Sequence, residues 1–593
     1  MKSGVSKLSE LLSPEQQYLT PIFQRPYSWK EDQLSPLWED VKEQYNRNFD
    51  ATKSAQPRSH FMGSIVVAPD PQPDITKPRH LLIDGQQRLT TLTVLLCAFR
   101  DCLWEEGSQE AQKLDRNFLI NESQDTEFQL KLKPAPTSAH ELRALVEYRE
   151  VTEPRGIADA YKLFYRKIEE LQEDHGEQFD SEILRSAIVN QLSFIIITCD
   201  PSDDPHQIFE SLNATGLSLS QSDLIRNLLF MSVGQTADAI KLHTDSWLPA
   251  MFWMETSTKK DAAKQMDDLF WADLIRQGEI GLTRENIYST YKSFSERKNR
   301  LNSSGNAKKE ILRMSALATP YRWLVDSKQF PGKTQGSEAV RRTLRDLQTW
   351  GTQPALPLLL ELADSRAVGL LTDKQFSDCC QYVLSFFVRR ALCGVPSNNL
   401  NRILFGTVDC IRASKEGGLL VKDLFAELSA ENAYWPTDAD LIERLPELNF
   451  YNFGRGPQRR LVLDSLELQR SGKERADLDV PGISIEHVMP QTLTPAWIKK
   501  FNVGKAEAIE LHQQLVHQIG NLTLTGYNGE LSNKDPERKK QLLATSVFRL
   551  SDEFKTVEWT PEGIRKRSIT LAKLACKVWK GPAPESQGIA GRY

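Results

Sequence analysis

The sequence predicts a predominantly helical α+β protein that is organised in three zones. Residues 1–235 mix short apolar runs, typical of strands, with helical stretches. Residues 236–450 follow helical periodicity almost throughout, and residues 451–593 return to short strands that end in polar side chains. The expected architecture is therefore an α+β domain, a helical linking region and a second α+β domain.

Composition limits the class of protein. The 593 residues are enough for two or three hydrophobic cores, and 40% hydrophobic with 26% charged residues is an ordinary globular balance. No apolar run approaches the roughly 20 residues that cross a bilayer, so we expect a cytoplasmic protein without a membrane partner. The eight cysteines contain no C-x-x-C pair, which fits a reducing compartment and leaves oxygen and nitrogen ligands for any metal. The net charge of −5 neither favours nor excludes a nucleic-acid partner.

In the first zone, apolar runs predict strands at Ser64–Ala68, Leu81–Ile83 and Phe194–Thr198. The second of these runs into Asp84, Gly85, Gln86, Gln87 and Arg88, and an amphipathic helix follows. A glycine turn between a strand and a helix exposes backbone N–H groups that attract anions. Arg88 suits phosphate, and Asp84 suits a metal or a sugar hydroxyl. Taken alone, this pattern is more typical of a capped turn without a ligand than of a binding site.

The middle zone contains one distinctive run, Phe387-Val388-Arg389-Arg390. Two arginines here predict either a buried pair that couples the domains or a helix face with salt-bridged side chains. The second alternative is slightly favoured.

The third zone carries the strongest chemical pattern. A predicted strand, Ile483–Ile485, leads into Glu486 and His487 and is stopped by Pro490. A carboxylate can hold a hard cation, and an imidazole can take a proton from an attacking water, so the pair suits phosphodiester hydrolysis. A second strand-like run opens at Asn521; it is followed by Asn528, by Asn533 and by a helix, Pro536–Ser546, that carries Arg538, Lys539 and Lys540.

This order of elements resembles the ββα-metal (HNH) nuclease motif. The runs E-H-V-M-P-Q, G-N-L-T-L-T and Y-N-G-E-L-S-N resemble the nuclease half of the GmrSD-type modification-dependent restriction enzymes. The resemblance implies that Glu486 is a metal ligand, that His487 is the general base and that Asn521 braces the loop and orients the histidine. It makes Asn528 the second metal ligand, with Asn533 as the alternative. An asparagine in the third motif favours Mg²⁺ or Mn²⁺ over a softer metal.

Simpler interpretations stand beside these roles. A single Glu-His pair is usually a solvated strand end, but the ordered set of motifs favours a nuclease. Arg538, Lys539 and Lys540 are predicted either to contact phosphates or to solvate a helix face, and the sequence does not separate the two. His512 and His517 fall on a helical stretch and are predicted to be structural or surface residues.

The N-terminal zone also resembles the GmrSD-type enzymes, through four blocks. They are F-Q-R-P-Y-S-W at 23–29, F-M-G-S-I-V-V at 61–67, D-G-Q-Q-R at 84–88 and I-F-E-S-L-N-A-T-G at 208–216. The resemblance implies a ParB/sulfiredoxin-like sensor that binds and hydrolyses a nucleoside triphosphate (NTP). It also implies recognition of modified double-stranded DNA, with glucosylated hydroxymethylcytosine or a phosphorothioate backbone. It places the following residues in or near the nucleotide or DNA pocket: Gln24, Arg25, Asp84, Gly85, Gln86, Gln87 and Arg88, with Glu210 and Asn213 as wall residues.

Three functions follow as hypotheses. The first is a modification-dependent DNA endonuclease of anti-phage defence, with an NTP-responsive sensor and a metal-dependent HNH site. The second is an NTP-dependent switch that binds modified DNA and has a secondary or nicking nuclease. The third, a ParB-like clamp without hydrolysis, leaves the C-terminal motif unexplained. The oligomeric state is open, and a homodimer is compatible with the sequence.

Overall fold

We describe the fold from a computed structural model. It describes residues 2–12, 14–21, 24, 27–49, 60–70, 76–103, 109–123, 125–148, 156–200, 220–234, 237–255, 262–414, 416–471, 478, 480–526, 531, 533–556 and 559–582. The chain forms two compact units. Unit 1 contains Met1–Phe270 and Thr283–Ser315, and unit 2 contains Trp271–Leu282 and Ala316–Tyr593. The division between them falls inside the predicted helical zone, 236–450, and not at either of its ends.

Unit 1 is built on a six-stranded mixed sheet with the order β1-β6-β3-β4-β2-β5. The strands are β1 (Lys2–Lys7), β2 (Gln17–Leu19), β3 (His60–Pro69), β4 (Arg79–Asp84), β5 (Leu132–Lys133) and β6 (Leu192–Thr198). The three predicted strands lie within β3, β4 and β6, so all three predictions are confirmed. β3 runs parallel to β6 and antiparallel to β4, so the end of β4 lies beside the middle of β3.

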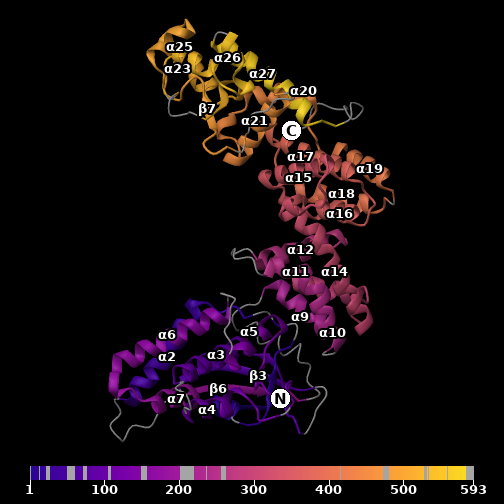
Figure 1. Cartoon of the computed structure of the whole chain (residues 1–593). Helices are drawn as coiled ribbons and strands as arrows, with labels where there is room; N and C mark the ends of the chain where they lie inside the picture. The colour runs from indigo at the N-terminus through magenta and orange to yellow at the C-terminus, as the bar shows by residue number, and fades with distance from the viewer. Residues whose placement is uncertain are drawn as a thin grey trace. The chain divides into compact units, whose positions relative to one another are not determined.

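Helices cover one face of this sheet (Figure 1). Alternate strand residues Ile65, Val67 and Leu82 pack with the helices in the main core, while Val66 and Ile83 belong to a second, smaller cluster. The helices of this part of the chain are α1 (Leu8–Leu12), α2 (Glu31–Phe49), α3 (Gln86–Cys102), α4 (Gln109–Leu114), α5 (Pro136–Val146), α6 (Ile157–His175), α7 (Ser181–Asn190), α9 (Gln221–Val233), α10 (Ala237–Leu242), α11 (Leu248–Glu255), α12 (Ala262–Arg276), α13 (Ile287–Arg297) and α14 (Ser304–Val325).

Unit 2 is mostly helical. Its further helices are α15 (Gln335–Trp350), α16 (Leu356–Ala367), α17 (Asp373–Leu392), α18 (Leu400–Arg412), α19 (Gly417–Ser429), α20 (Asp438–Arg444), α21 (Gly456–Arg470), α22 (Pro495–Phe501), α23 (Lys505–Leu515), α25 (Pro536–Ala544), α26 (Glu553–Thr556) and α27 (Pro561–Val578). Taken with unit 1, this confirms a predominantly helical α+β fold.

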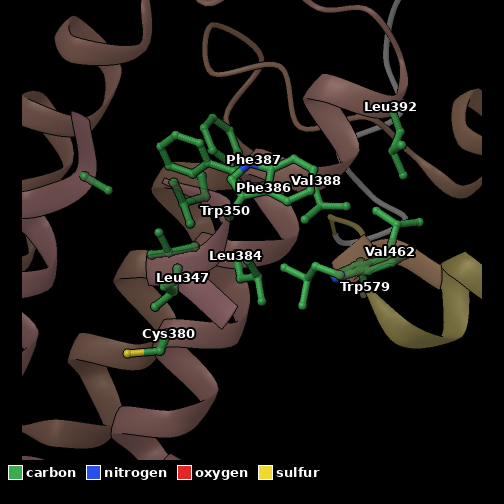
Figure 2. Close-up of a cluster of buried hydrophobic side chains, with 14 of the residues drawn as sticks. Leu347, Trp350, Cys380, Leu384, Phe386, Phe387, Val388, Leu392, Val462 and Trp579 are labelled. Carbon is green, nitrogen blue, oxygen red and sulfur yellow. The ribbon is translucent and has the colours of Figure 1, made fainter. Parts of the chain in front are cut away.

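The larger core of unit 2 extends from Trp323 in the helical region to Trp579. Figure 2 shows part of it, where Trp350 of α15, Phe386 of α17, Val462 of α21 and Trp579 gather. The same cluster includes Leu522 of strand β8 (Leu522–Thr525). The nuclease-like strands are therefore packed on the helical region and share its core.

The Arg389–Arg390 pair lies in this core. Arg389 is fully buried and donates to the carbonyl oxygens of Trp579 (2.7 Å) and Pro436 (3.0 Å). Arg390 donates to the carbonyl oxygens of Tyr434 and Pro396. Arg389 also forms an ion pair with Asp438 at 2.5 Å, so the predicted salt bridge is present for one of the two arginines. The predicted helix face is corrected in that both side chains are buried and donate mainly to backbone carbonyls within unit 2.

None of the helices inside the described ranges is both long enough and apolar enough to traverse a lipid bilayer.

Candidate active site

The predicted Glu-His strand is the first half of a hairpin. β7 (Ser484–His487) pairs antiparallel with β8, with Glu486 opposite Thr523 and His487 opposite Leu522. The amide of Val488 then donates to the carbonyl of Asn521 (2.9 Å), which extends the pairing by one residue. Helix α25 follows in the chain; Asp535 caps it by accepting from the Arg538 amide. The region thus has two antiparallel strands followed by a helix.

Asn521 is completely buried and holds the chain just beyond His487. Its Oδ1 accepts from the Met489 amide (2.7 Å), and its Nδ2 donates to the carbonyls of Met489 (2.9 Å) and Val516 (2.8 Å). The indole of Trp559 donates to the same Oδ1 at 3.3 Å. The backbone bonds of the Asn521 side chain go to Met489 and Val516, and none of the four bonds involves the His487 ring. Any effect of Asn521 on the histidine therefore passes through the loop.

Glu486 is buried against a lysine from α25. Lys539 Nζ lies 2.6 Å from Glu486 Oε1 and donates to the His487 carbonyl at 2.6 Å, with only 1% of the lysine side chain exposed. Burial raises the pKa of the Glu486 carboxyl and lowers that of Lys539, while the bond between them opposes both shifts. Lys539 is therefore the counter-ion of Glu486. It is neither a phosphate contact on the surface nor part of a solvated face, and both predictions for it are corrected.

The two basic neighbours of Lys539 differ from it. Arg538 and Lys540 are exposed, because adjacent residues on a helix point about 100° apart. Lys540 lines a small pocket together with Trp497 and Trp559. Both alternatives, a phosphate contact or a solvated face, stay open for these two side chains.

His487 is 5% exposed and lies among three polar or aromatic side chains. Its Nε2 lies 3.2 Å from His517 Nδ1, and its Nδ1 lies 3.4 Å from Gln491 Nε2. The rings of His487 and Tyr451 form a T-shaped pair, with 4.3 Å between centroids. Burial lowers the pKa of His487 to about 3, and neighbouring His517 adds to the shift. The ring is therefore neutral, as a proton acceptor must be.

The sequence reasoning missed His517. The helix α23 ends at Leu515, so His517 stands beyond it, where the carbonyl of the same residue accepts from the Tyr451 amide. His512 remains on α23 and its Nε2 contacts the Pro490 carbonyl at 2.8 Å, which fits the predicted structural role. No spacing rule separates the two histidines, because only the end of the helix directs one toward His487.

The structure describes only some of the predicted metal ligands. Asn528 lies outside the described residues, and Asn533 is exposed just before α25. Within the described ranges, no three His, Cys, Asp or Glu side chains are grouped as metal ligands. Glu486 supplies an oxygen donor of the kind that a hard cation prefers. Its carboxylate is paired with the ammonium of Lys539, so a cation would have to share Glu486 with that lysine. The amide ligands would have to complete the site.

The N-terminal blocks meet at the end of β4. Gly85 is in the left-handed conformation with φ of 93° and precedes α3; a Cβ on it would lie 2.9 Å from Ile65 Cγ1. Gln24 Nε2 donates to the Ile83 carbonyl (2.9 Å), and Gln87 Oε1 accepts from the Ser28 amide (2.9 Å). Three of the four blocks therefore converge on one strand-to-helix turn.

Arg88 joins this turn to β3. Its Nη1 donates to the Ser64 carbonyl (2.6 Å) and lies 4.0 Å from Asp84 Oδ2, and both side chains are about one-third exposed. Gln86 and Gln87 are buried. The remaining predicted residues of this pocket, Arg25, Glu210 and Asn213, lie outside the described residues.

The comparisons with known proteins agree with both halves. Residues 8–230 match the model of the GmrSD restriction endonuclease N-terminal domain, and residues 435–574 match the GmrSD restriction endonuclease C-terminal domain. The uncharacterized protein MJ0686 of Methanocaldococcus jannaschii is 26% identical over 222 residues, which is 35% of this chain and 38% of that protein. Both halves of the chain match in the expected order, one around the D-G-Q-Q-R turn and the other around the Glu486–His487 hairpin. The chain is a member of the GmrSD restriction endonuclease family.

Proposed function

We propose that this protein is a modification-dependent DNA endonuclease of anti-phage defence whose C-terminal site is of the HNH type. The observation that supports it best is the placement of buried His487 beside Glu486 at the end of β7, with the loop held by Asn521. Helix α25 packs its Lys539 against the same hairpin, as a ββα arrangement requires. We propose that the protein is located in the cytoplasm, where it would encounter phage DNA.

In this proposal His487 accepts the proton of the water that attacks the scissile phosphorus. Its Nε2 faces His517, so Nδ1, on the side of exposed Gln491, is the nitrogen that takes the proton. Glu486 and Asn528, or Asn533 in its place, would hold Mg²⁺ or Mn²⁺. When bound, such an ion stabilises the charge that develops on the phosphate and on the leaving oxygen. Arg538 and Lys540 are available to bind flanking phosphates.

His487→Ala tests the nuclease assignment. The full-length protein and the variant are incubated with plain, hydroxymethylated, glucosylated and phosphorothioated DNA, with Mg²⁺ or Mn²⁺ and with or without each NTP. We expect cleavage of one modified DNA by the wild type and a loss of at least about 10³-fold in the variant, because a general base and its positioning are removed together.

The matched control is His140→Ala, which removes an exposed histidine of unit 1 and should leave cleavage unchanged. Thermal unfolding of both variants shows whether the fold is intact. Cleavage at the wild-type rate by a folded His487→Ala protein contradicts the assignment.

For the N-terminal half, we propose that the turn at Asp84–Arg88 binds and hydrolyses an NTP. The support is the convergence of three sequence blocks on one turn before α3, where the positive end of the helix dipole favours phosphate. Arg88 uses one nitrogen for the Ser64 carbonyl and has further N–H donors available. Asp84→Asn and Arg88→Ala should abolish NTP turnover; turnover equal to the wild type in both variants contradicts this role.

The alternative function is an NTP-dependent switch that binds modified DNA and only nicks it. The same turn supports it, since a sensor can act without a strong nuclease. A supercoiled plasmid that carries the modification separates the two functions, because an endonuclease yields linear product and a nickase stops at the open circle.

A further inference from the structure

The general base of the proposed nuclease has a histidine partner. A neutral imidazole carries one N–H and one lone pair, and the hydrogen bond at one nitrogen decides which nitrogen can take a proton. His487 has a side-chain contact at each ring nitrogen, so its tautomer can be worked out from the partners.

The contact at His487 Nδ1 determines which ring nitrogen donates and which accepts. Gln491 Nε2 lies 3.4 Å from His487 Nδ1, and an amide nitrogen only donates. His487 Nδ1 is therefore an acceptor, and the ring hydrogen lies on Nε2. That hydrogen is donated to His517 Nδ1 at 3.2 Å, so His517 acts as an acceptor and carries its own hydrogen on Nε2.

Neighbouring residues hold His517 in this orientation. The ring of Tyr451 stacks on His517, with 5.5 Å between centroids and 13° between the planes, and it also forms a T-shaped pair with His487, so it contacts both histidines. The Tyr451 amide also donates to the His517 carbonyl at 3.1 Å. His512 does not compete, because its Nε2 is directed to the Pro490 carbonyl.

We propose that His517 is a positioning residue that fixes His487 with its hydrogen on Nε2 and so leaves Nδ1 to accept the proton of the attacking water. The proposal rests on the nuclease function proposed above. In this proposal His517, which lies on the segment that leads into β8, orients the general base His487. Tyr451, from the segment before α21, then supports the pair from outside the hairpin and α25.

Two substitutions of His517 separate positioning from packing. In His517→Asn the side-chain oxygen can still accept from His487 Nε2, whereas in His517→Leu nothing can. With the full-length protein, modified DNA and Mn²⁺, we expect His517→Leu to lower the single-turnover cleavage rate by about 10²- to 10⁴-fold, as loss of the correct tautomer does in other hydrolases. His517→Asn should recover the rate to within about tenfold of the wild type. The DNA Kd, measured without divalent metal, should change less than threefold (about 0.65 kcal/mol at RT ≈ 0.59 kcal/mol) in both variants.

A second readout does not depend on cleavage. In protein labelled with ¹⁵N-histidine, the His487 signals, assigned by their loss in His487→Gln, should show a protonated Nε2 and an unprotonated Nδ1. His517→Leu should give a mixture of the two tautomers, and His517→Asn should restore the single form.

Three results would overturn the proposal: a hydrogen on Nδ1 in the wild type, wild-type cleavage by His517→Leu, or equal loss in the Leu and Asn variants. Failure of the nuclease function itself is seen separately, as cleavage that survives His487→Ala. The tautomer measurement stands in either case.

Discussion

Lys539 places a positive charge where the nuclease-like hairpin has its one buried carboxylate, Glu486. Breaking such a pair from one side leaves an uncompensated charge in the interior, which costs about 3–5 kcal/mol. We therefore expect Lys539→Met to lower the stability of unit 2 by that amount. The double variant Glu486→Gln/Lys539→Met should recover most of the loss, since it buries no charge. Urea unfolding of the three proteins measures both effects.

Lys540→Met is the matched control for this prediction. Lys540 is the next residue on α25 but is exposed, so its replacement should change the stability by no more than about 0.5 kcal/mol. If Lys539→Met is as stable as Lys540→Met, the ion pair does not form in solution.

The same residues show how far the sequence determines the site. Glu486, His487 and Asn521 could be found because their types and order are those that phosphodiester hydrolysis needs. Lys539 and His517 could not, because a lysine among basic residues and a histidine near a helix are ordinary surface patterns. Their roles depend on the rotation of α25 against the hairpin and on where α23 ends, which are outcomes of tertiary packing.

At the level of elements, the segment before β8 depends on close approach to α27. Gly520 donates its N–H to Ser568 Oγ (3.1 Å), and a Cβ on it would lie 2.2 Å from the Ile564 carbonyl oxygen and from Ser568 Oγ. Gly520→Ala must push α27 away from the 3₁₀ turn Ile519–Asn521, so it should cost at least about 1–3 kcal/mol. It should also reduce cleavage, because Asn521 would shift with the turn.

Gly504→Ala is the control, because a Cβ there meets nothing within 4 Å. It precedes α23 in the same unit with an ordinary φ of −62°, so both cleavage and the melting temperature should stay near the wild type. Equal melting temperatures of the two alanine variants would show that α27 does not pack on Gly520.

Element prediction from sequence succeeded where strands are apolar and buried. The runs at Ser64–Ala68, Leu81–Ile83 and Phe194–Thr198 all lie in strands of the central sheet. β1 was not predicted, since Lys2–Lys7 contains a single large apolar residue, Val5, which is 76% exposed. Edge strands such as this one are formed by backbone pairing, which leaves little trace in the pattern of side chains.

Over the whole molecule, the predicted three zones and the two units differ for a physical reason. Composition changes at about residue 450, but the core of unit 2 continues across it, from Trp323 to Trp579. Arg389 reinforces this continuity through its bond to the Trp579 carbonyl. Long-range packing of this kind cannot be inferred from local periodicity.

Each unit has its own core, so we expect thermal unfolding in two transitions. The midpoint of the unit 1 transition should depend more strongly on pH, because His243 lies in unit 1. Burial lowers the pKa of His243 to about 4, and the charge of Arg226 adds to the shift. In the unfolded chain His243 has an ordinary pKa near 6.5. Between about pH 6.5 and pH 4 the unfolded chain therefore binds a proton at His243 that the folded state does not bind. The stabilisation is complete above about pH 6.5 and is lost as the pH falls toward 4, with about 2 kcal/mol lost by pH 5.

His243→Leu removes this titration while it keeps an apolar side chain against Phe230, whose ring also contacts Trp247. Between pH 7.5 and pH 5, the unit 1 transition of the wild type should therefore fall by several degrees more than that of the variant. The unit 2 transition, identified by its shift in Gly520→Ala, serves as the internal control and should respond equally in both proteins. If His243→Leu and the wild type show the same acid shift in the unit 1 transition, His243 is not buried as a neutral side chain.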